Sequence, residues 1–222
     1  MDAITTGYHN VAVGYHSLGA ATAADFNVAV GKSALAAATT SDFNVAVGRS
    51  SLVANTTGVN NTGLGYGALS FNTTASYNTS VGSHSLQDNT TGASNTALGY
   101  QALANNTTAS HNTAVGFNAL TTNTMLTNTT GAQNTAVGRN ALYTSTGDSN
   151  AAFGYYAGYG ITTGIENTAL GNQAMIAATT GSYNTGVGCY ALDAAVTGSS
   201  NVAVGHQALS ANTSGGSNVA IG

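Results

Sequence analysis

The chain has 222 residues, of which only three are Lys or Arg and seven are Asp or Glu, and its formal net charge is −4. About a quarter of the residues of an average domain are charged, so this composition excludes a nucleic-acid binder that relies on a basic surface. The single cysteine, Cys189, excludes an intrachain disulfide, and the lack of an apolar run of about 18 residues excludes a membrane-spanning helix.

One short motif recurs along the whole chain. It consists of Asn, then Val or Thr (once Ala), a small residue, a large apolar residue and Gly, and the spacing of its copies is 17 in ten of twelve intervals. The spacing is 22 between Asn112 and Asn134, and 16 between Asn134 and Asn150. The Asn residues are Asn10, Asn27, Asn44, Asn61, Asn78, Asn95, Asn112, Asn134, Asn150, Asn167, Asn184, Asn201 and Asn218. The Gly residues are Gly14, Gly31, Gly48, Gly65, Gly82, Gly99, Gly116, Gly138, Gly154, Gly171, Gly188, Gly205 and Gly222.

Each copy of the motif predicts a short strand, because β-branched and small residues alternate before a Gly. Four residues after the Gly comes a second apolar column, which runs from Leu18 to Leu209 and predicts a second strand. A polar turn follows, usually Thr-Thr-Gly as at residues 56–58. Strands this short bury a core only when copies stack. The sequence therefore predicts an all-β, parallel β-solenoid of 13 turns, with two short strands in each 17-residue turn, as a single domain over residues 1–222.

The constant Asn and Gly columns are expected to serve the fold. Stacked Asn side chains can hydrogen-bond to their neighbours above and below. The Gly allows a backbone angle that is costly for other residues, so the chain can turn sharply after the strand. Neither column indicates a catalytic or metal site, and no cofactor is expected.

The apolar residues of the first strand predict a homotrimer. Side chains alternate between the two faces of a strand, so the small residue points one way and the Val or Thr and the larger apolar residue point the other way. Sequence alone leaves open which face is the interior of the roll and which is the seam between chains. The chain stops in a regular motif, residues 218–222, without a polar cap. We therefore expect truncation, a missing continuation or end-to-end stacking.

Segments such as 95–103 (NTALGYQAL) and 201–209 (NVAVGHQAL) resemble the YadA-like head repeats of trimeric autotransporter adhesins and the similar repeats of bacteriophage tail fibres. The resemblance covers nearly the whole chain. It implies a left-handed parallel β-roll that trimerises about its long axis. The 17-residue repeat is somewhat longer than expected for adhesin heads, and neither a coiled-coil stalk nor a tail-fibre chaperone domain is visible.

Irregular turns are the candidate receptor contacts, because loops on a rigid scaffold often carry recognition. The longer interval contains Met125 and Leu126, and the Leu column is interrupted by a segment that contains Tyr155, Tyr156 and Tyr159. Asp25 and Asp42 share one position in adjacent repeats, about 5 Å apart if stacked, but a surface charge patch explains them better than catalysis does. No other arrangement of side chains indicates an enzyme.

The predicted function is a structural fibre or adhesion segment, most simply of a phage tail fibre or appendage in the virion, acting as a rigid spacer and host-receptor binder. Residues 1–5 lack the features of a signal peptide, which favours the phage particle. Expected partners are other copies of the chain, other tail or fibre proteins, and host-surface carbohydrate or protein. Two alternatives stay open: the head of a bacterial surface adhesin, and an ice-binding solenoid with outward Thr columns.

Overall fold

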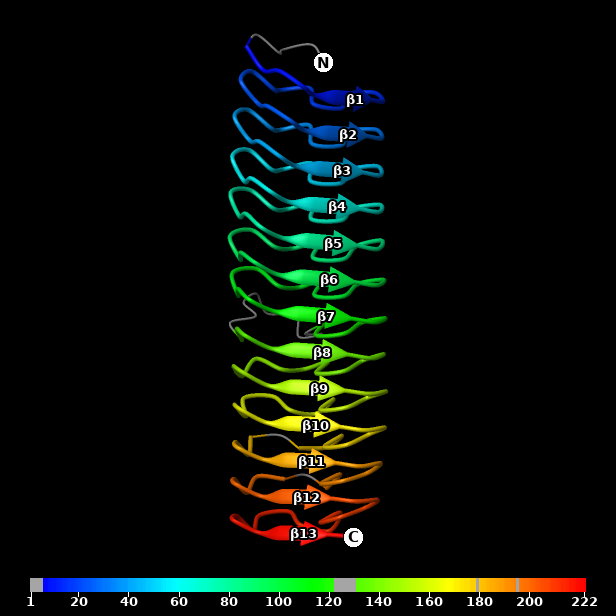
Figure 1. The fold of residues 1–222 in the computed structure, drawn as a ribbon, viewed down its shortest axis with the longest axis vertical. Helices are drawn as coiled ribbons and strands as arrows, with labels where there is room; N and C mark the ends of the chain where they lie inside the picture. Colours follow the sequence, from blue (N-terminus) through cyan, green and yellow to red (C-terminus); the bar gives the residue numbers. More distant parts are fainter. Residues whose placement is uncertain (1–5, 122–130, 179, 195) are drawn as a thin grey trace. The chain divides into compact units, whose positions relative to one another are not determined.

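The computed structural model describes residues 6–121, 131–178, 180–194 and 196–222. The chain divides into two compact units, residues 1–111 and 112–222, and each unit is a stack of turns with one strand per turn (Figure 1). The first unit contains β1 (Val11–Val13), β2 (Val28–Val30), β3 (Val45–Val47), β4 (Thr62–Leu64), β5 (Thr79–Val81) and β6 (Thr96–Leu98). The second contains β7 (Thr113–Val115), β8 (Thr135–Val137), β9 (Ala151–Phe153), β10 (Thr168–Leu170), β11 (Thr185–Val187), β12 (Val202–Val204) and β13 (Val219–Ile221). In the part of the chain described, no helix is long and apolar enough to cross a membrane.

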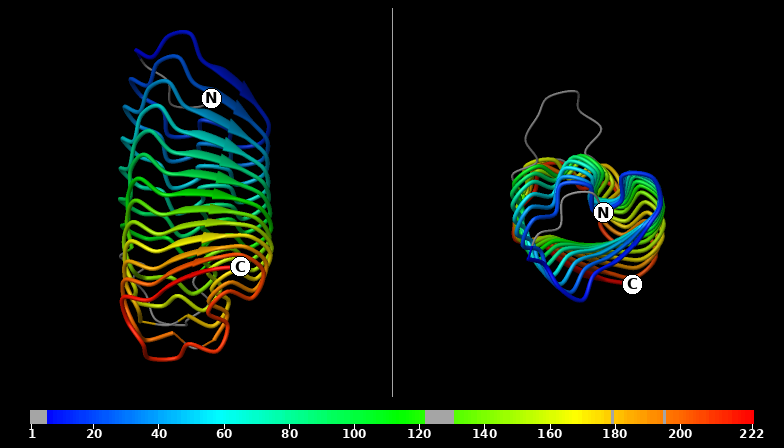
Figure 2. Two further views of the ribbon diagram at one scale, coloured as in Figure 1. Left: turned by 60° about the horizontal axis from the view of Figure 1, so that its bottom comes forward. Right: turned by 90° about the horizontal axis from the view of Figure 1, so that it is seen from above.

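Within each unit the strands pair in parallel, and every residue lies beside its equivalent in the next repeat. Ala29 pairs with Ala46, for example, and Ala46 with Gly63. The two irregular intervals keep this register, since Thr113 pairs with Thr135 and Thr135 with Ala151. Successive turns of each unit follow almost the same closed path when viewed along the stack (Figure 2). The predicted all-β, parallel β-solenoid, in which each turn is one copy of the 17-residue repeat, is therefore confirmed.

The predicted second strand of each turn is wrong. Around Leu52, the segment after the Gly forms a series of tight turns, in which Ser51 N–H donates to the Gly48 carbonyl and Asn55 N–H donates to the Leu52 carbonyl. Leu52 has a φ of 50°, which lies in the left-handed region and is incompatible with an extended strand. Its N–H still donates to the next turn, to the Ala68 carbonyl at 2.9 Å. The segment thus stacks turn upon turn without becoming a strand.

The interior of the stack holds the small residue of the strand and the Leu of the turn segment. Ala46, Leu52, Ala68 and Leu69 are all fully buried. A large residue in the strand position would overfill this space, because the Leu side chains already occupy it. The structure therefore decides the question that the sequence left open: the small column faces inward, and the Val or Thr and the larger apolar residue face outward.

Candidate functional site

The outward face of the strands combines a column of large apolar residues with a column of Val or Thr (once Ala), and the described residues leave both columns partly or largely exposed. In β6 the inward Ala97 is fully buried, whereas the outward Leu98 keeps 46% of its surface exposed. The exposed large apolar residues of this strand face are Val11, Val13, Val45, Leu64 and Leu98 in the first unit, and Phe153, Leu170, Val204, Val219 and Ile221 in the second. Exposed large apolar residues in a row of this kind indicate a candidate interaction surface.

One border of the strand face, here called the cationic edge, is the column of residues that directly follow the constant Gly. It contains all three Lys and Arg side chains of the chain, Lys32, Arg49 and Arg139. Each cation lies over aromatic rings of the same column in adjacent turns. Lys32 Nζ is 5.9 Å from the centre of the Tyr15 ring, and Arg49 Cζ is 5.6 Å from that of Tyr66. Such contacts contribute about 0.5–1 kcal/mol at exposed sites.

Arg139 shows the same arrangement in the second unit. Its Cζ lies 5.5 Å from the centre of the Phe117 ring and 5.9 Å from that of Tyr155. The guanidinium group thus lies between rings of the two adjacent turns. The aromatic residues of this column therefore hold the cations in place along the edge.

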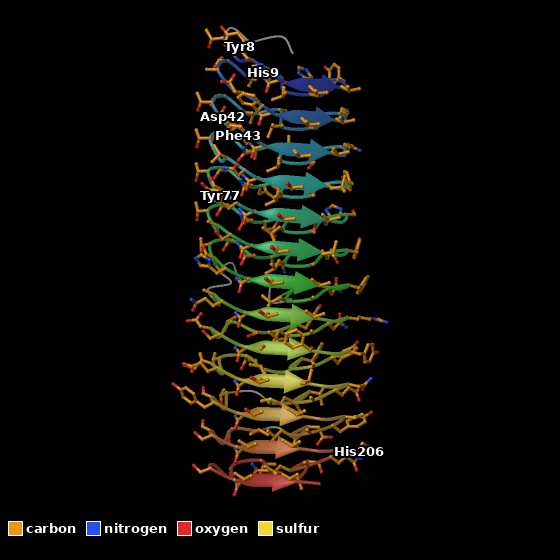
Figure 3. The ribbon with its side chains drawn as sticks, viewed as in Figure 1. Tyr8, His9, Asp42, Phe43, Tyr77 and His206 are labelled. Atoms are coloured by element: carbon orange, nitrogen blue, oxygen red, sulfur yellow. The ribbon has the colours of Figure 1, made fainter. Side chains whose placement is uncertain are left out.

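The opposite border, here called the acidic edge, is formed by the turn that precedes the constant Asn. Asp25, Asp42 and Asp148 occupy one column, two residues before the Asn. Their carboxylates accept backbone N–H bonds from the preceding turn: Asp42 from Asp25 N at 2.7 Å, and Asp148 from Ala132 N at 2.8 Å. In Figure 3, Asp42 lies where the turn enters its strand, whereas His206, a member of the cationic-edge column, lies beyond the tip of β12. The strand face thus has carboxylates along one border and cations along the other.

Aromatic rings stack along the acidic edge of the first unit. The rings of His9 and Phe26 are 4.7 Å apart and those of Phe26 and Phe43 are 5.1 Å apart, with interplanar angles of 5° and 3°. Phe26 and Phe43 keep 48% and 54% of their surface exposed. Because the rings face one another, their edges are the parts turned to solvent, so the stack offers little flat ring surface to a sugar.

The constant Asn column is buried except at its two ends, Asn10 and Asn218, and it joins successive turns. Asn44 N–H donates to Oδ1 of Asn27 at 2.9 Å, and Nδ2 of Asn44 donates to the Gly58 carbonyl at 2.9 Å. The same pair of bonds recurs in most described copies, so the side-chain amide more often holds the backbone of the next turn than a neighbouring amide. The constant Gly31 has a φ of 129°, and an added Cβ would lie 2.7 Å from the Gly48 carbonyl carbon. Both columns thus occupy positions at which the stack leaves no space for a ligand.

A second Asn ladder, which the sequence reasoning missed, lies inside the first unit. Asn72 Nδ2 donates to Asn55 Oδ1, Asn89 to Asn72 and Asn106 to Asn89, each at 2.8 Å. All four residues are buried. The signal was present in the sequence, since these Asn residues recur at intervals of 17, three residues after the Leu of each repeat.

The candidate receptor contacts are only partly placed. Met125 and Leu126 lie outside the described residues. Tyr155, Tyr156 and Tyr159 lie together: the rings of Tyr155 and Tyr156 are 4.5 Å apart, and those of Tyr156 and Tyr159 are 4.9 Å apart. Tyr143, which the sequence reasoning did not select, stacks on Tyr159 at 5.2 Å.

The break in the Leu column beside these tyrosines is filled from within the same turn. Gly158 stands in the Leu position, and an added Cβ there would lie 3.1 Å from Cδ1 of Ile161. Ile161 itself is 1% exposed. The buried Ile161 side chain therefore takes the space that Leu occupies in other turns, and the Tyr residues are not needed to fill the core.

Titratable groups do not gather into a centre in the described residues. Among those residues, no group of three or more His, Cys, Asp or Glu side chains could hold a metal ion. One carboxyl departs from its ordinary behaviour: burial raises the pKa of Asp88, and the positive charge of His84 partly opposes this rise. Nδ1 of His84 lies 2.7 Å from Oε1 of Gln87 in the same turn. Asp88 is a half-buried carboxyl with His84 as its electrostatic neighbour, and in the described part of the chain the two belong to no larger cluster of metal-ligating side chains.

Comparisons with known proteins identify no relative of this chain. No family model matches the chain, and neither a curated protein nor a solved structure matches it significantly.

Proposed function

We propose that this chain is a structural segment of a fibre, most simply a phage tail fibre or appendage, that assembles as a homotrimer and acts as a rigid spacer and adhesive. The observation that carries the proposal is the apolar column of the strand face, on which Leu64 and Leu98, two turns apart, are each nearly half exposed. Burial of each such side chain against another chain would contribute on the order of 1 kcal/mol. Many equivalent turns would add these small gains together.

A second copy of the chain is the partner that fits this face best. The outward apolar residues repeat with the spacing of the strands, which is about 4.8 Å. Another copy presents the same spacing, so contacts made by one turn are repeated by the next. Closed cyclic symmetry buries the face of every copy, and a threefold axis along the stack suits a fibre. Left-handed winding of the turns, which the resemblance implies, stays a prediction.

The assembly is tested with charges placed on the face. Leu64→Asp together with Leu98→Asp should convert a trimer into a folded monomer, as measured by analytical ultracentrifugation and circular dichroism. The matched control, Thr57→Asp together with Thr91→Asp, adds the same charge at two exposed turn residues and should leave the trimer intact. A protein that sediments as a monomer before any substitution would overturn the trimeric fibre.

The place of the chain is tested on particles. Antibodies raised against it should label the tails of purified phage in electron micrographs. Labelling of bacterial cell surfaces instead would favour the adhesin alternative, which has the same architecture. Attachment is tested by replacing Met125, Leu126 and Tyr159 together by Ala, which should reduce adsorption to host cells. Unchanged adsorption would remove these residues as receptor contacts.

A further inference from the structure

The few charged residues at the borders of the strand face are separated by sign. Lys32, Arg49 and Arg139 lie on the cationic edge, and Asp25, Asp42 and Asp148 lie on the acidic edge. Within one chain the cations contact aromatic rings, and the carboxylates accept backbone N–H bonds. The strand runs from one edge to the other, so opposite charges of one turn are held apart by the apolar face itself.

The hydrogen bonds of the aspartates fix the level of each carboxylate along the stack. Asp42 belongs to the repeat after Lys32, but its Oδ1 accepts from Asp25 N, in the turn that leads to Lys32. Asp148 likewise belongs to the repeat after Arg139, and its Oδ1 accepts from Ala132 N, in the turn that leads to Arg139. In both units the carboxylate therefore reaches toward the preceding turn, which carries a cation on the opposite edge.

We propose that the acidic edge of one copy packs against the cationic edge of the next, with Asp42 pairing with Lys32 and Asp148 with Arg139, and that these pairs restrict the register of the assembly. The inference rests on the homotrimer proposed above. In a ring of copies around a rotation axis parallel to the stack, each copy presents its acidic edge to one neighbour and its cationic edge to the other. Equivalent residues of all copies lie at the same height along the axis. Oppositely charged groups then meet at every interface, whereas an antiparallel arrangement would not keep each carboxylate at the level of its cation.

The apolar strand face alone does not define the register between two copies, because the same contacts repeat in every turn. Sliding one copy by a whole turn would match Val and Leu columns almost as well as before, just as flat repetitive strands are prone to slip. The charges are not periodic, because they occur in only a few of the thirteen repeats. A slip of one turn in one direction separates both pairs and leaves all three cations opposite uncharged residues. A slip of one turn in the other direction separates Arg139 from Asp148 but places Lys32 opposite Asp25 and Arg49 opposite Asp42. Sparse charges thus restrict the assembly to two adjacent registers, as flanking charges restrict pairing in coiled coils.

Zero-length crosslinking tests the pairing directly, since Lys32 carries the only side-chain amine of the chain. A carbodiimide should join Lys32 to Asp42, whereas a bond to Asp25 would mark an assembly shifted by one turn. Mass spectrometry of a trimer assembled from a mixture of unlabelled and ¹⁵N-labelled chains should find mixed-isotope crosslinked peptides, which shows that the bond joins two chains. Trimers whose Lys32 is not crosslinked, or is joined to Asp25, Asp88 or Asp193, would overturn the pairing and leave the fibre proposal standing. A protein that is monomeric would overturn both.

Charge reversal gives a second, independent measurement. Lys32→Asp should weaken trimer assembly about tenfold at low salt, because like charges then meet across the interface. Asp42→Lys should do the same, and the two substitutions together should restore assembly, since each reversed edge meets a reversed edge. Circular dichroism checks that each variant is folded. Should Asp42 variants fail to fold, the pair Arg139→Asp and Asp148→Lys provides the same cycle. Failure of either double variant to recover while folded would contradict the pairing.

Discussion

Asn72 donates a hydrogen bond from Nδ2 to Oδ1 of Asn55, 2.8 Å away in the preceding turn, and accepts the equivalent bond from Asn89 of the following turn. Nδ2 of Asn72 also donates to the Ala75 carbonyl at 3.0 Å. Asn72 is fully buried, so its side-chain amide depends on these protein groups for its hydrogen bonds. The turn segment of the first unit is thus held by a continuous chain of side-chain amides as well as by backbone bonds.

Replacing Asn72 by Ala should therefore lower the free energy of unfolding by about 1–3 kcal/mol, because buried polar groups of Asn55 and Asn89 lose a partner. The measurement is the midpoint of urea unfolding. Asn172→Ala, at an exposed position on the cationic edge, is the matched control and should stay within about 0.5 kcal/mol. Equal effects of the two substitutions would show that the second ladder does not stabilise the fold.

A change in side-chain size should have different effects on the inward and outward faces of one strand. Ala97→Leu places a large side chain in the filled interior and should destabilise the protomer by about 1–3 kcal/mol. Leu98→Ala, one residue further along the strand, removes surface that the protomer itself leaves half exposed. It should weaken association more than folding, as judged by comparing sedimentation with thermal unfolding at low protein concentration. A protomer that tolerates Ala97→Leu would contradict the inward direction of the small column.

The substitution of Gly158 for Leu and the burial of Ile161 should form a compensating pair. Ile161→Ala alone should cost about 2–4 kcal/mol, because it leaves a cavity beside Leu142. Gly158→Leu alone should also destabilise, since an added Cβ would lie 2.9 Å from Cδ2 of Leu142. The double variant should recover much of the loss, because Leu then occupies the space as it does in other turns. Additive losses in a double-mutant cycle would show that the two residues do not share one space.

Asp88 should make stability depend on pH in a predictable direction. Burial raises its pKa above the ordinary value of 3.8, so the folded state holds this proton more tightly than the unfolded state. Its contribution therefore becomes unfavourable as pH rises from the ordinary value through the raised one. Asp88→Asn removes the buried charge and should raise the melting temperature at pH 7, with the gain disappearing at pH 3. Asp193→Asn, which changes the net charge equally, is the control, and an equal gain in both variants would point to net charge alone.

Much of the fold could be read from the sequence because the same short pattern is repeated. The spacing of the Asn, Gly and Leu columns determined the number of turns, the parallel register and the exclusion of a helix. Even the irregular intervals were visible, and the structure keeps Thr113 beside Thr135 across the longer one. Repetition makes local preferences reliable, since a residue type that fits one turn is used again at the same place in the next.

Tertiary structure alone decided which way the strands face and how the turn segment runs. Alternation along a strand defines two faces, but the path of the rest of the turn determines which one is enclosed. Here Leu52 takes a left-handed backbone angle, its segment turns back tightly, and its side chain meets the small residues of the strands. The apolar Val and Leu columns are thereby left outside. The same path carries Lys32 and Asp42 to opposite borders of that face, so the sequence by itself determined the repeat, and the closed turn decided what the repeat presents to a partner.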